Sequence, residues 1–156
     1  EGRELDDDCN ILVHYNGGAR GILHASQIST GYENGLNFRI FGTEGGLQWV
    51  QENPNYLVYS KPGEPKQILS RSNGYLCDAA TRGTRLPAGH PEAFHEAFAN
   101  LYMNITDTIR ADLLGIKPEP LALDFPTYDE GLRGMQFITT AVESDKSSEK
   151  WTKLIK

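Results

Sequence analysis

Residues 9–26 read CNILVHYNGGARGILHAS, and they decide the fold class of the first half of the chain. The side chains at odd-numbered positions from Cys9 to Tyr15 are apolar, which is the two-residue period of a β-strand. The turn residues Asn16-Gly17-Gly18 follow, and both residue types tolerate positive φ. The segment therefore predicts a β-hairpin whose return strand covers residues 19–26.

Four more strands are expected after the hairpin, over residues 37–41, 47–50, 56–59 and 66–69. Short turns rich in glycine, asparagine or proline separate them, and such turns favour antiparallel neighbours. The turn at residues 42–46, GTEGG, is the glycine-rich stretch that comes nearest to a phosphate cradle. Because it lies between two strands and carries a glutamate, we interpret it as a tight turn.

The second half of the chain changes to a helical pattern. Residues 70–89 are expected to form a long loop, which in a compact domain is often functional. A helix is expected to begin near His90, since Pro91 suits the first helical position, and to end at Gly115 and Pro118. Its apolar stripe comprises Phe94, Phe98, Leu101, Ile105, Ile109 and Leu113.

A second helix is predicted from the capping box at residues 127–130, TYDE. Its stripe comprises Leu132, Met135, Ile138 and Val142. Residues 151–155 could add a last short strand. Strands followed by helices indicate an α+β fold, here an open, largely antiparallel (mixed) sheet of about six strands with helices on one face. Since Phe38 and Phe41 place apolar groups on both faces, the other face is expected to meet a second subunit or a missing domain.

Composition excludes several classes of protein. The 156 residues carry a net charge of -6 without a basic patch, so nucleic acid is not an expected partner. No apolar run approaches the length of a membrane span, so no membrane is expected either. Cys9 and Cys77 lie in no metal or redox motif, which favours a reducing, cytoplasmic location. No signal peptide is expected, and the start at Glu1 suggests a fragment of a longer chain.

One segment concentrates polar chemistry: residues 82–92, RGTRLPAGHPE. It brings two arginines, a histidine and backbone N–H groups to an expected helix N-terminus, a corner that could bind polyols or anions. Alternatively, His90 only caps the helix, and the sequence leaves both readings open. The four histidines lack the spacing of a zinc pair, so no metal is expected. The acidic run at residues 6–8 is interpreted as a solvated strand entrance.

An ordered set of segments carries a family resemblance. It includes DDD at 6–8, LVHY at 12–15, NGGARG at 16–21, HASQ at 24–27, ENGL at 33–36, FGTEGGLQW at 41–49, PAGHPEAF at 87–94, DFPT at 124–127 and DEGLRG at 129–134. The chain resembles the Gfo/Idh/MocA oxidoreductases, which include glucose–fructose oxidoreductase and inositol dehydrogenases. The resemblance covers nearly the whole chain.

The resemblance implies that residues 1–156 are one domain, the C-terminal half of a two-domain enzyme. The N-terminal half would be a Rossmann domain that holds NAD or NADP, and the segment alone would bind no cofactor. The family's Glu-Lys-Pro lysine and the histidine of its Asp-x-Gly-x-His helix have no counterpart in this sequence, so no catalytic residue carries over. Residues His90, Arg85, Gln27 and Tyr32 are the candidates for lining a substrate site.

Three hypotheses follow. The first is the substrate-binding and assembly domain of an oxidoreductase acting on a sugar, sugar derivative or inositol, a homo-oligomer through its sheet, inactive when alone. The second is a free-standing, non-catalytic binding or oligomerisation module with the same fold. The third is a small α+β enzyme centred on His90, which no nucleophile or acid/base pair supports.

Overall fold

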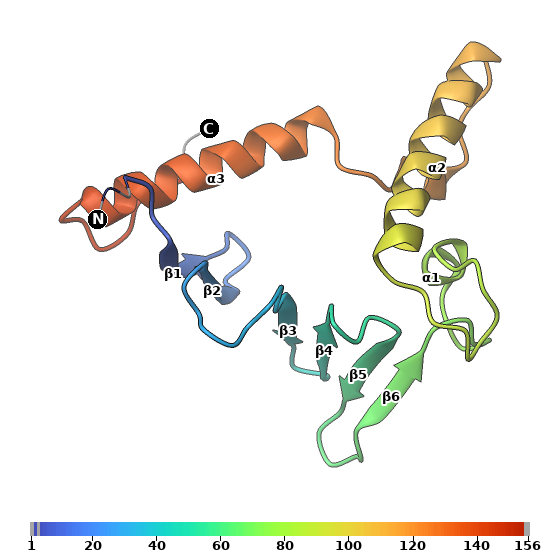
Figure 1. The fold of residues 1–156 in the computed structure, drawn as a ribbon, viewed down its shortest axis with the longest axis horizontal. Coiled ribbons are helices and arrows are strands. Elements are labelled where there is room, and N and C mark those ends of the chain that lie inside the picture. The colour runs from blue at the N-terminus through green and yellow to red at the C-terminus, as the bar shows by residue number, and fades with distance from the viewer. Residues whose placement is uncertain (1, 3, 155–156) are drawn as a thin grey trace. The chain divides into compact units, whose positions relative to one another are not determined.

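The computed structural model describes residue 2 and residues 4–154, and the chain divides into two compact units (Figure 1). The first unit comprises Glu1–Tyr32 and Pro126–Lys156, and the second comprises Glu33–Phe125. The first unit thus joins the two ends of the chain, and the second is continuous in sequence.

The first unit contains the predicted hairpin. Strand β1 (Asp8–His14) pairs antiparallel with β2 (Arg20–Ser26). Gly18 has a φ of 88° and donates its N–H to the Tyr15 carbonyl at 2.9 Å, as a tight turn requires. The register sets His24 opposite Asn10 and His14 opposite Arg20, so the two histidines are not paired, as predicted.

Helix α3 (Tyr128–Lys146) also belongs to the first unit. Its N-terminus has the predicted capping interaction, since the Glu130 carboxylate accepts the Thr127 N–H at 2.8 Å and also the Thr127 hydroxyl. After the helix, residues 151–154 form no strand, and Ile155 of the expected strand lies outside the described residues. The Trp151 ring instead stacks on His14 with ring centroids 3.7 Å apart, which ties this segment to the end of β1.

The cap of α3 predicts a pH-dependent stability. Hydrogen bonds from the Thr127 hydroxyl and N–H lower the pKa of Glu130 below its ordinary value of 4.5. The stabilisation is therefore present above that value and is lost as the pH falls through the lower pKa of the folded state. We expect Glu130→Gln to lower the midpoint of thermal unfolding, followed by circular dichroism, at neutral pH but not at about pH 2. The exposed Glu143→Gln is the control, and an equal loss at both pH values would contradict the prediction.

The second unit contains a four-stranded antiparallel sheet in the order β3–β4–β5–β6. The strands are β3 (Asn37–Phe41), β4 (Gly46–Val50), β5 (Tyr56–Ser60) and β6 (Gln67–Ser70). Their register places Phe38, Trp49, Leu57 and Leu69 in one row across the sheet. The Trp49 ring stacks on Phe38 with centroids 5.5 Å apart, and its indole N–H is donated to the Pro54 carbonyl at 3.1 Å.

Three helices follow in the second unit: α1 (Asp78–Arg82), α2 (Phe94–Leu113) and the 3₁₀ helix η1 (Pro120–Leu123). Helix α1 lies within the stretch that the sequence predicts as loop. Helix α2 ends as predicted before Gly115, which has a φ of 65°. It packs against η1, and this contact buries Ala111 and Ala122.

Burial is sparse among the described residues. Ala111 and Ala122 are the hydrophobic side chains that are fully buried, and Glu92 and Thr140 are the buried polar ones. The predicted apolar stripes exist, but Phe94 and Ile109 on α2 and Met135 on α3 are each more than half exposed. A packed domain normally covers such stripes, so within each unit these apolar surfaces remain available for contact.

The fold is α+β, as predicted, with the six expected strands in their expected places. The strands differ from the expectation in belonging to two sheets, of two and four strands, rather than one. Residues 27–36, between β2 and β3, form turns and irregular structure and contain no strand. Among the described residues, no helix is both long enough and apolar enough to cross a membrane.

Candidate functional site

The segment before α2 is the candidate site, and its backbone differs from the prediction. Helix α2 begins at Phe94 rather than near His90, and its N-terminal cap is Ala93. Gly89 has a φ of 81°, and the His90 N–H is donated to the Pro87 carbonyl at 3.2 Å, which makes a turn instead of a helix start. His90 therefore does not cap the helix, and the capping alternative is wrong. We call residues 85–91 the His90 loop.

Arg71, directly after β6, holds the His90 loop. Its guanidinium donates to the carbonyl oxygens of Leu86 at 2.7 Å, Pro87 at 3.4 Å and His90. It also forms an ion pair with Glu92, with 2.9 Å between Nη1 and Oε1. A planar guanidinium has five donors in fixed directions, so one side chain can satisfy several loop carbonyls at once.

Glu92 holds the loop from the other end. Its side chain is 6% exposed, and its Oε1 accepts the Arg85 N–H at 2.7 Å and the Leu86 N–H. The Asn55 side chain donates to the Glu92 carbonyl and accepts the Glu92 N–H, both at 2.9 Å. These N–H groups are thus already bonded within the chain. The expectation that they are free to bind an anion is wrong.

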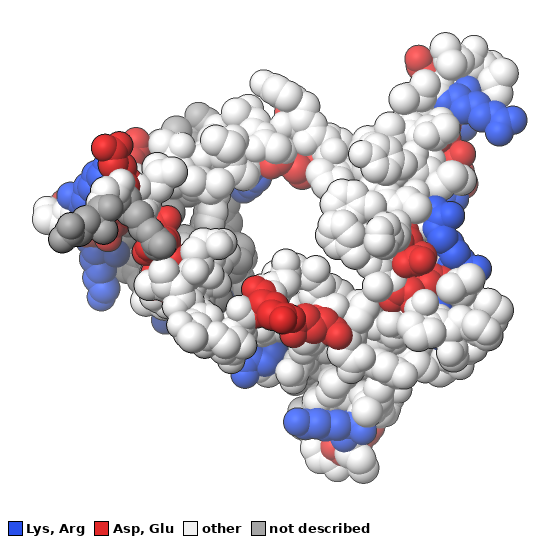
Figure 2. All heavy atoms as spheres, viewed as in Figure 1, with Lys and Arg blue, Asp and Glu red and all other residues white. Residues whose placement is uncertain are grey.

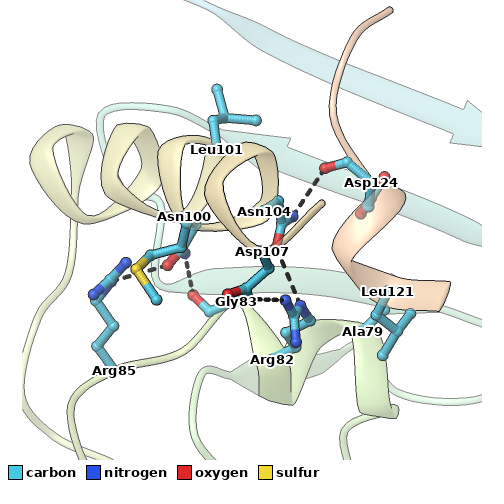
Figure 3. Close-up of a pocket in the computed structure, with 11 residues that line it drawn as sticks. Ala79, Arg82, Gly83, Arg85, Asn100, Leu101, Asn104, Asp107, Leu121 and Asp124 are labelled. Carbon is cyan, nitrogen blue, oxygen red and sulfur yellow. Dashed lines mark hydrogen bonds and ion pairs between the residues drawn. The ribbon is translucent and has the colours of Figure 1, made fainter. Parts of the chain in front are cut away.

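A pocket of about 340 Å³ lies beside α2, where α1 and η1 approach it (Figure 3). It is lined by Ala79, Arg82, Gly83, Arg85, Asn100, Leu101, Met103, Asn104, Asp107, Leu121 and Asp124. Arg85 therefore connects the His90 loop to this pocket, whereas His90 is not one of the lining residues.

Arg82 links the elements around the pocket. Its guanidinium forms ion pairs with Asp107 at 3.0 Å and Glu119 at 3.1 Å, and it donates to the Asn104 side chain at 3.1 Å. Asn104 and Asp107 lie on α2 (Figure 3), and Glu119 is the N-terminal cap of η1, so Arg82 fixes α1 to both elements. This explains why α1 forms although its sequence has little helical periodicity. The charge of Arg82 is thus already paired within the chain.

The side chains of Arg85 and His90 remain accessible. Arg85 is exposed, and its Nε donates to the Asn100 side chain at 2.9 Å. Within residues 4–154, its outer guanidinium nitrogens have no hydrogen-bond partner. The His90 ring is exposed too, with its Nδ1 3.4 Å from the Ala88 carbonyl oxygen. Both groups could therefore donate hydrogen bonds to a ligand.

The two other predicted site residues belong to the first unit. Gln27 donates its backbone N–H to the Asp7 carbonyl at 2.7 Å and lines a pocket of about 160 Å³ with the acidic run. Tyr32 is 76% exposed, and its N–H is donated to the Ser29 carbonyl at 3.1 Å. Arg85 and His90 lie in the second unit, so each unit contributes two of the four candidates.

The acidic run and the histidines form no metal site. Across the described part of the chain, no three His, Cys, Asp or Glu side chains are grouped so that they could hold a metal ion. Asp8 instead interacts with His24, with 3.2 Å between Oδ1 and Nε2. Hydrogen bonds from Ser26 and then from His24 lower the pKa of Asp8, so this carboxylate is satisfied within the hairpin.

The turn between β3 and β4 is tight. The Gly42 N–H is donated to the Gly45 carbonyl at 2.8 Å. A Cβ at Gly45 would lie 2.7 Å from the Ser60 carbonyl oxygen, so this glycine permits close approach to β5. The interpretation as a tight turn is therefore confirmed.

Sequence reasoning missed the residues that hold the loop, Arg71 and Asn55. Their partners lie 15 to 37 positions away, so no local spacing links them. Glu92 itself is visible in the sequence as an acidic residue just before the helix, but its residue type does not indicate that it is buried.

The chain matches the model of the Gfo/Idh/MocA oxidoreductase family, C-terminal alpha/beta domain, over residues 1–154. An uncharacterized oxidoreductase, YfiI, of Bacillus subtilis (strain 168) is 34% identical over 149 residues. The match covers 94% of this chain and 37% of that protein.

Solved structures agree with this assignment. An oxidoreductase from Sinorhizobium meliloti is 41% identical with a TM-score of 0.89, over 98% of this chain and 43% of that one. An inositol dehydrogenase homolog from Azotobacter vinelandii, complexed with NADH and myo-inositol, is 33% identical with a TM-score of 0.81, over 96% of this chain and 39% of that one. The chain spans about two fifths of the length of these relatives. It belongs to the Gfo/Idh/MocA oxidoreductase family and corresponds to the family's C-terminal α/β domain.

Proposed function

We propose that this chain is the substrate-binding and assembly domain of an NAD- or NADP-dependent oxidoreductase acting on a sugar, a sugar derivative or an inositol. The observation that carries the proposal is the likeness to the inositol dehydrogenase homolog whose structure contains NADH and myo-inositol. That likeness covers 96% of this chain at 33% identity. The exposed donors of Arg85 and His90 fit a polyol, because hydroxyl groups accept hydrogen bonds from charged and neutral N–H groups.

The residues of this chain do not fit the cofactor itself. A dinucleotide pyrophosphate needs a glycine-rich turn leading into a helix N-terminus, and the sequence contains no such fingerprint. The turn at residues 42–46 joins two strands and is packed against β5. Binding of NAD or NADP is therefore proposed for the part of the enzyme that this chain does not include, and no step of hydride transfer is assigned to these residues.

The proposed work of this chain is to bind and orient the polyol. Arg85 would donate from its outer nitrogens while Asn100 fixes its Nε, and His90 would hydrogen-bond a second hydroxyl. Gln27 and Tyr32, which belong to the first unit, are likewise proposed to contact the substrate. Such contacts raise catalytic efficiency by orientation, because they hold the reacting carbon against the nicotinamide.

The proposal is tested by assaying the full-length enzyme with NAD and with NADP against a panel of inositols, aldoses and sugar acids. Turnover is followed by the absorbance of the reduced nicotinamide. The expected result is oxidation of at least one polyol of the panel. Absence of turnover with every member of the panel, with either nucleotide, would contradict the proposal.

Substitution of Arg85 gives a sharper test. Arg85→Ala in the full-length enzyme is expected to raise the KM for the polyol about tenfold to a hundredfold, because a hydrogen bond to a charged group contributes about 1.5–3 kcal/mol. The KM for the nucleotide should not change. Arg110→Ala, an exposed arginine at the far end of α2, is the control. Equal polyol KM values for the two variants would remove Arg85 from the substrate site.

The sheet of the second unit is proposed to bind a second copy of the protein. Its register gathers Phe38, Ile40, Leu47, Trp49, Leu57, Tyr59 and Leu69 on one face. Phe38 and Ile40 remain exposed there, and an apolar face of this kind is typical of homodimer interfaces. Size-exclusion chromatography with light scattering should show an oligomer of the full-length protein. A monomer at all concentrations would exclude the interface.

The alternative is a free-standing module that assembles but does not catalyse. The exposed apolar stripes of α2 and α3 favour it, because they too require a partner. It predicts a gene that encodes this domain alone and a product that forms a stable dimer without any nucleotide. A gene that also encodes a glycine fingerprint upstream would exclude it.

A further inference from the structure

The His90 loop is held by its main chain, which leaves its side chains available. The loop presents carbonyl oxygens at Leu86, Pro87 and His90 to Arg71. It presents the N–H groups of Arg85 and Leu86 to Glu92. The Arg85 guanidinium and the His90 ring take no part in these bonds.

The two holding side chains are more buried than the groups they hold. Glu92 is 6% exposed and the Arg71 side chain is 15% exposed, with 2.9 Å between their charged atoms. The Asn55 side chain accepts a hydrogen bond from the Arg71 Nε at 3.0 Å. It also forms hydrogen bonds with both the N–H and the carbonyl group of Glu92. A largely buried, fully bonded pair of this kind specifies one geometry, because each charge loses its partner if the loop moves.

The backbone next to Arg71 supports the same conclusion. Ser72 has a φ of 61°, a left-handed conformation that a non-glycine residue adopts at a cost. Its hydroxyl donates to the Leu86 carbonyl at 2.6 Å, the same oxygen that Arg71 binds. Residues held in such conformations are concentrated where the surrounding structure fixes a functional segment.

We propose that Arg71 and Glu92 are positioning residues, which hold the His90 loop in the conformation that presents Arg85 and His90 to the polyol. The proposal rests on the proposed function for its consequence in catalysis, but the ordering of the loop stands independently of it. Loss of either charge frees the loop and misplaces both donors. The binding of the polyol weakens, while the binding of the nucleotide does not.

The test uses Arg71→Lys in the full-length enzyme. A lysine keeps the charge but has a single nitrogen, which cannot reach the acceptors spread over the loop. Arg110→Lys is the matched control, since that exposed side chain lies in the last turn of α2, takes no part in the bonds that hold the loop, and keeps its charge. Glu92→Gln is the second variant, because it retains shape and acceptor while removing only the charge. Circular dichroism first establishes that each variant is folded.

Loop order is measured by limited digestion with trypsin, with mass spectrometry of the cut at the Arg85–Leu86 bond. In the wild type, both flanking N–H groups are bound by Glu92, so the bond is protected. Arg71→Lys is expected to speed this cut about tenfold. It is also expected to raise the polyol KM about tenfold or more, because a displacement of about 1 Å can cost a hundredfold in rate. The nucleotide KM should stay within about twofold of the wild-type value.

The outcomes separate this proposal from the proposed function. If the wild type oxidises no polyol, the proposed function fails, and the rate of the tryptic cut still decides whether Arg71 and Glu92 order the loop. If the wild type is active but Arg71→Lys and Glu92→Gln match Arg110→Lys in both cut rate and polyol KM, the positioning role is overturned. A faster cut with an unchanged polyol KM would overturn the part of the proposal that concerns the substrate.

Discussion

Glu92→Ala is expected to destabilise the second unit by about 3–5 kcal/mol, the usual cost of removing one partner from a buried ion pair. The carboxylate is 6% exposed and accepts three hydrogen bonds, from Arg71 at 2.9 Å, from the Arg85 N–H at 2.7 Å and from the Leu86 N–H. Alanine leaves the guanidinium without its counter-charge and both N–H groups without an acceptor. A buried group left in this way loses its hydration without compensation.

The measurement is denaturant unfolding followed by the fluorescence of Trp49 in a Trp151→Phe background. One tryptophan lies in each unit, so this background reports on the second unit alone. Glu64→Ala, in the exposed turn between β5 and β6, is the control and should change little. Glu92→Gln should lose about 1–2 kcal/mol, because the amide oxygen still accepts hydrogen bonds. If Glu92→Ala unfolded at the same denaturant concentration as Glu64→Ala, the buried pair would have no structural importance.

The second large effect concerns the chain in isolation. We expect the 156-residue chain to show no dehydrogenase turnover and no binding of NAD or NADP, whereas the full-length enzyme shows both. Hydride transfer requires the nicotinamide to be held against the substrate carbon, and neither the sequence nor the turn at residues 42–46 offers a site for the dinucleotide. The relatives that it matches are longer, and the chain covers 37% of one and 43% of another.

Isothermal titration calorimetry of the chain with each nucleotide measures binding, and nicotinamide absorbance measures turnover. The full-length enzyme under the same conditions is the positive control, and the circular dichroism spectrum of the chain shows that it is folded. Micromolar binding of either nucleotide by the isolated chain would contradict the prediction. It would also revive the hypothesis of a small enzyme centred on His90.

The sheet was the part of the fold most open to prediction from sequence. Strand β3 begins and ends where the alternation of residues 37–41 predicts, and β1 and β2 differ from their predicted bounds by one residue. Turn chemistry explains this success, because glycine and asparagine between short apolar runs restrict both where a strand ends and which strand pairs with it. The division into two sheets depends on the path of residues 27–36, which no local pattern specifies.

The helix entrance was mispredicted for a physical reason. Pro91 suits a first helical turn, but the bonds of Asn55 to the Glu92 backbone hold this segment outside the helix. Tertiary contacts therefore overrode a local preference. Helix α1 was missed for a similar reason, since Arg82 fixes it through partners on α2 and beside η1. Contacts between distant segments leave no periodic trace in a single sequence.

In the candidate site too, local sequence predicts some features and tertiary contacts set the others. Arg85 and His90 could be chosen from residue type and from their place before a helix, but Arg71 could not, because its loop partners are 15 to 19 positions away. The sequence thus indicated which side chains could meet a ligand. It did not indicate what orders them.

Asn55, Arg71 and Glu92 together limit how the His90 loop can be exchanged in protein engineering. These three residues come from separate stretches of the gene but hold one loop. The His90 loop therefore cannot be exchanged by itself between related enzymes. In a chimera that imports residues 85–91 alone, the main-chain carbonyl groups would lie where Arg71 binds them only if the new segment took the same backbone conformation. Chimeras that inherit Asn55, Arg71 and Glu92 from the same parent as the loop should fold far more often. Crossover points are therefore best placed outside residues 55–92.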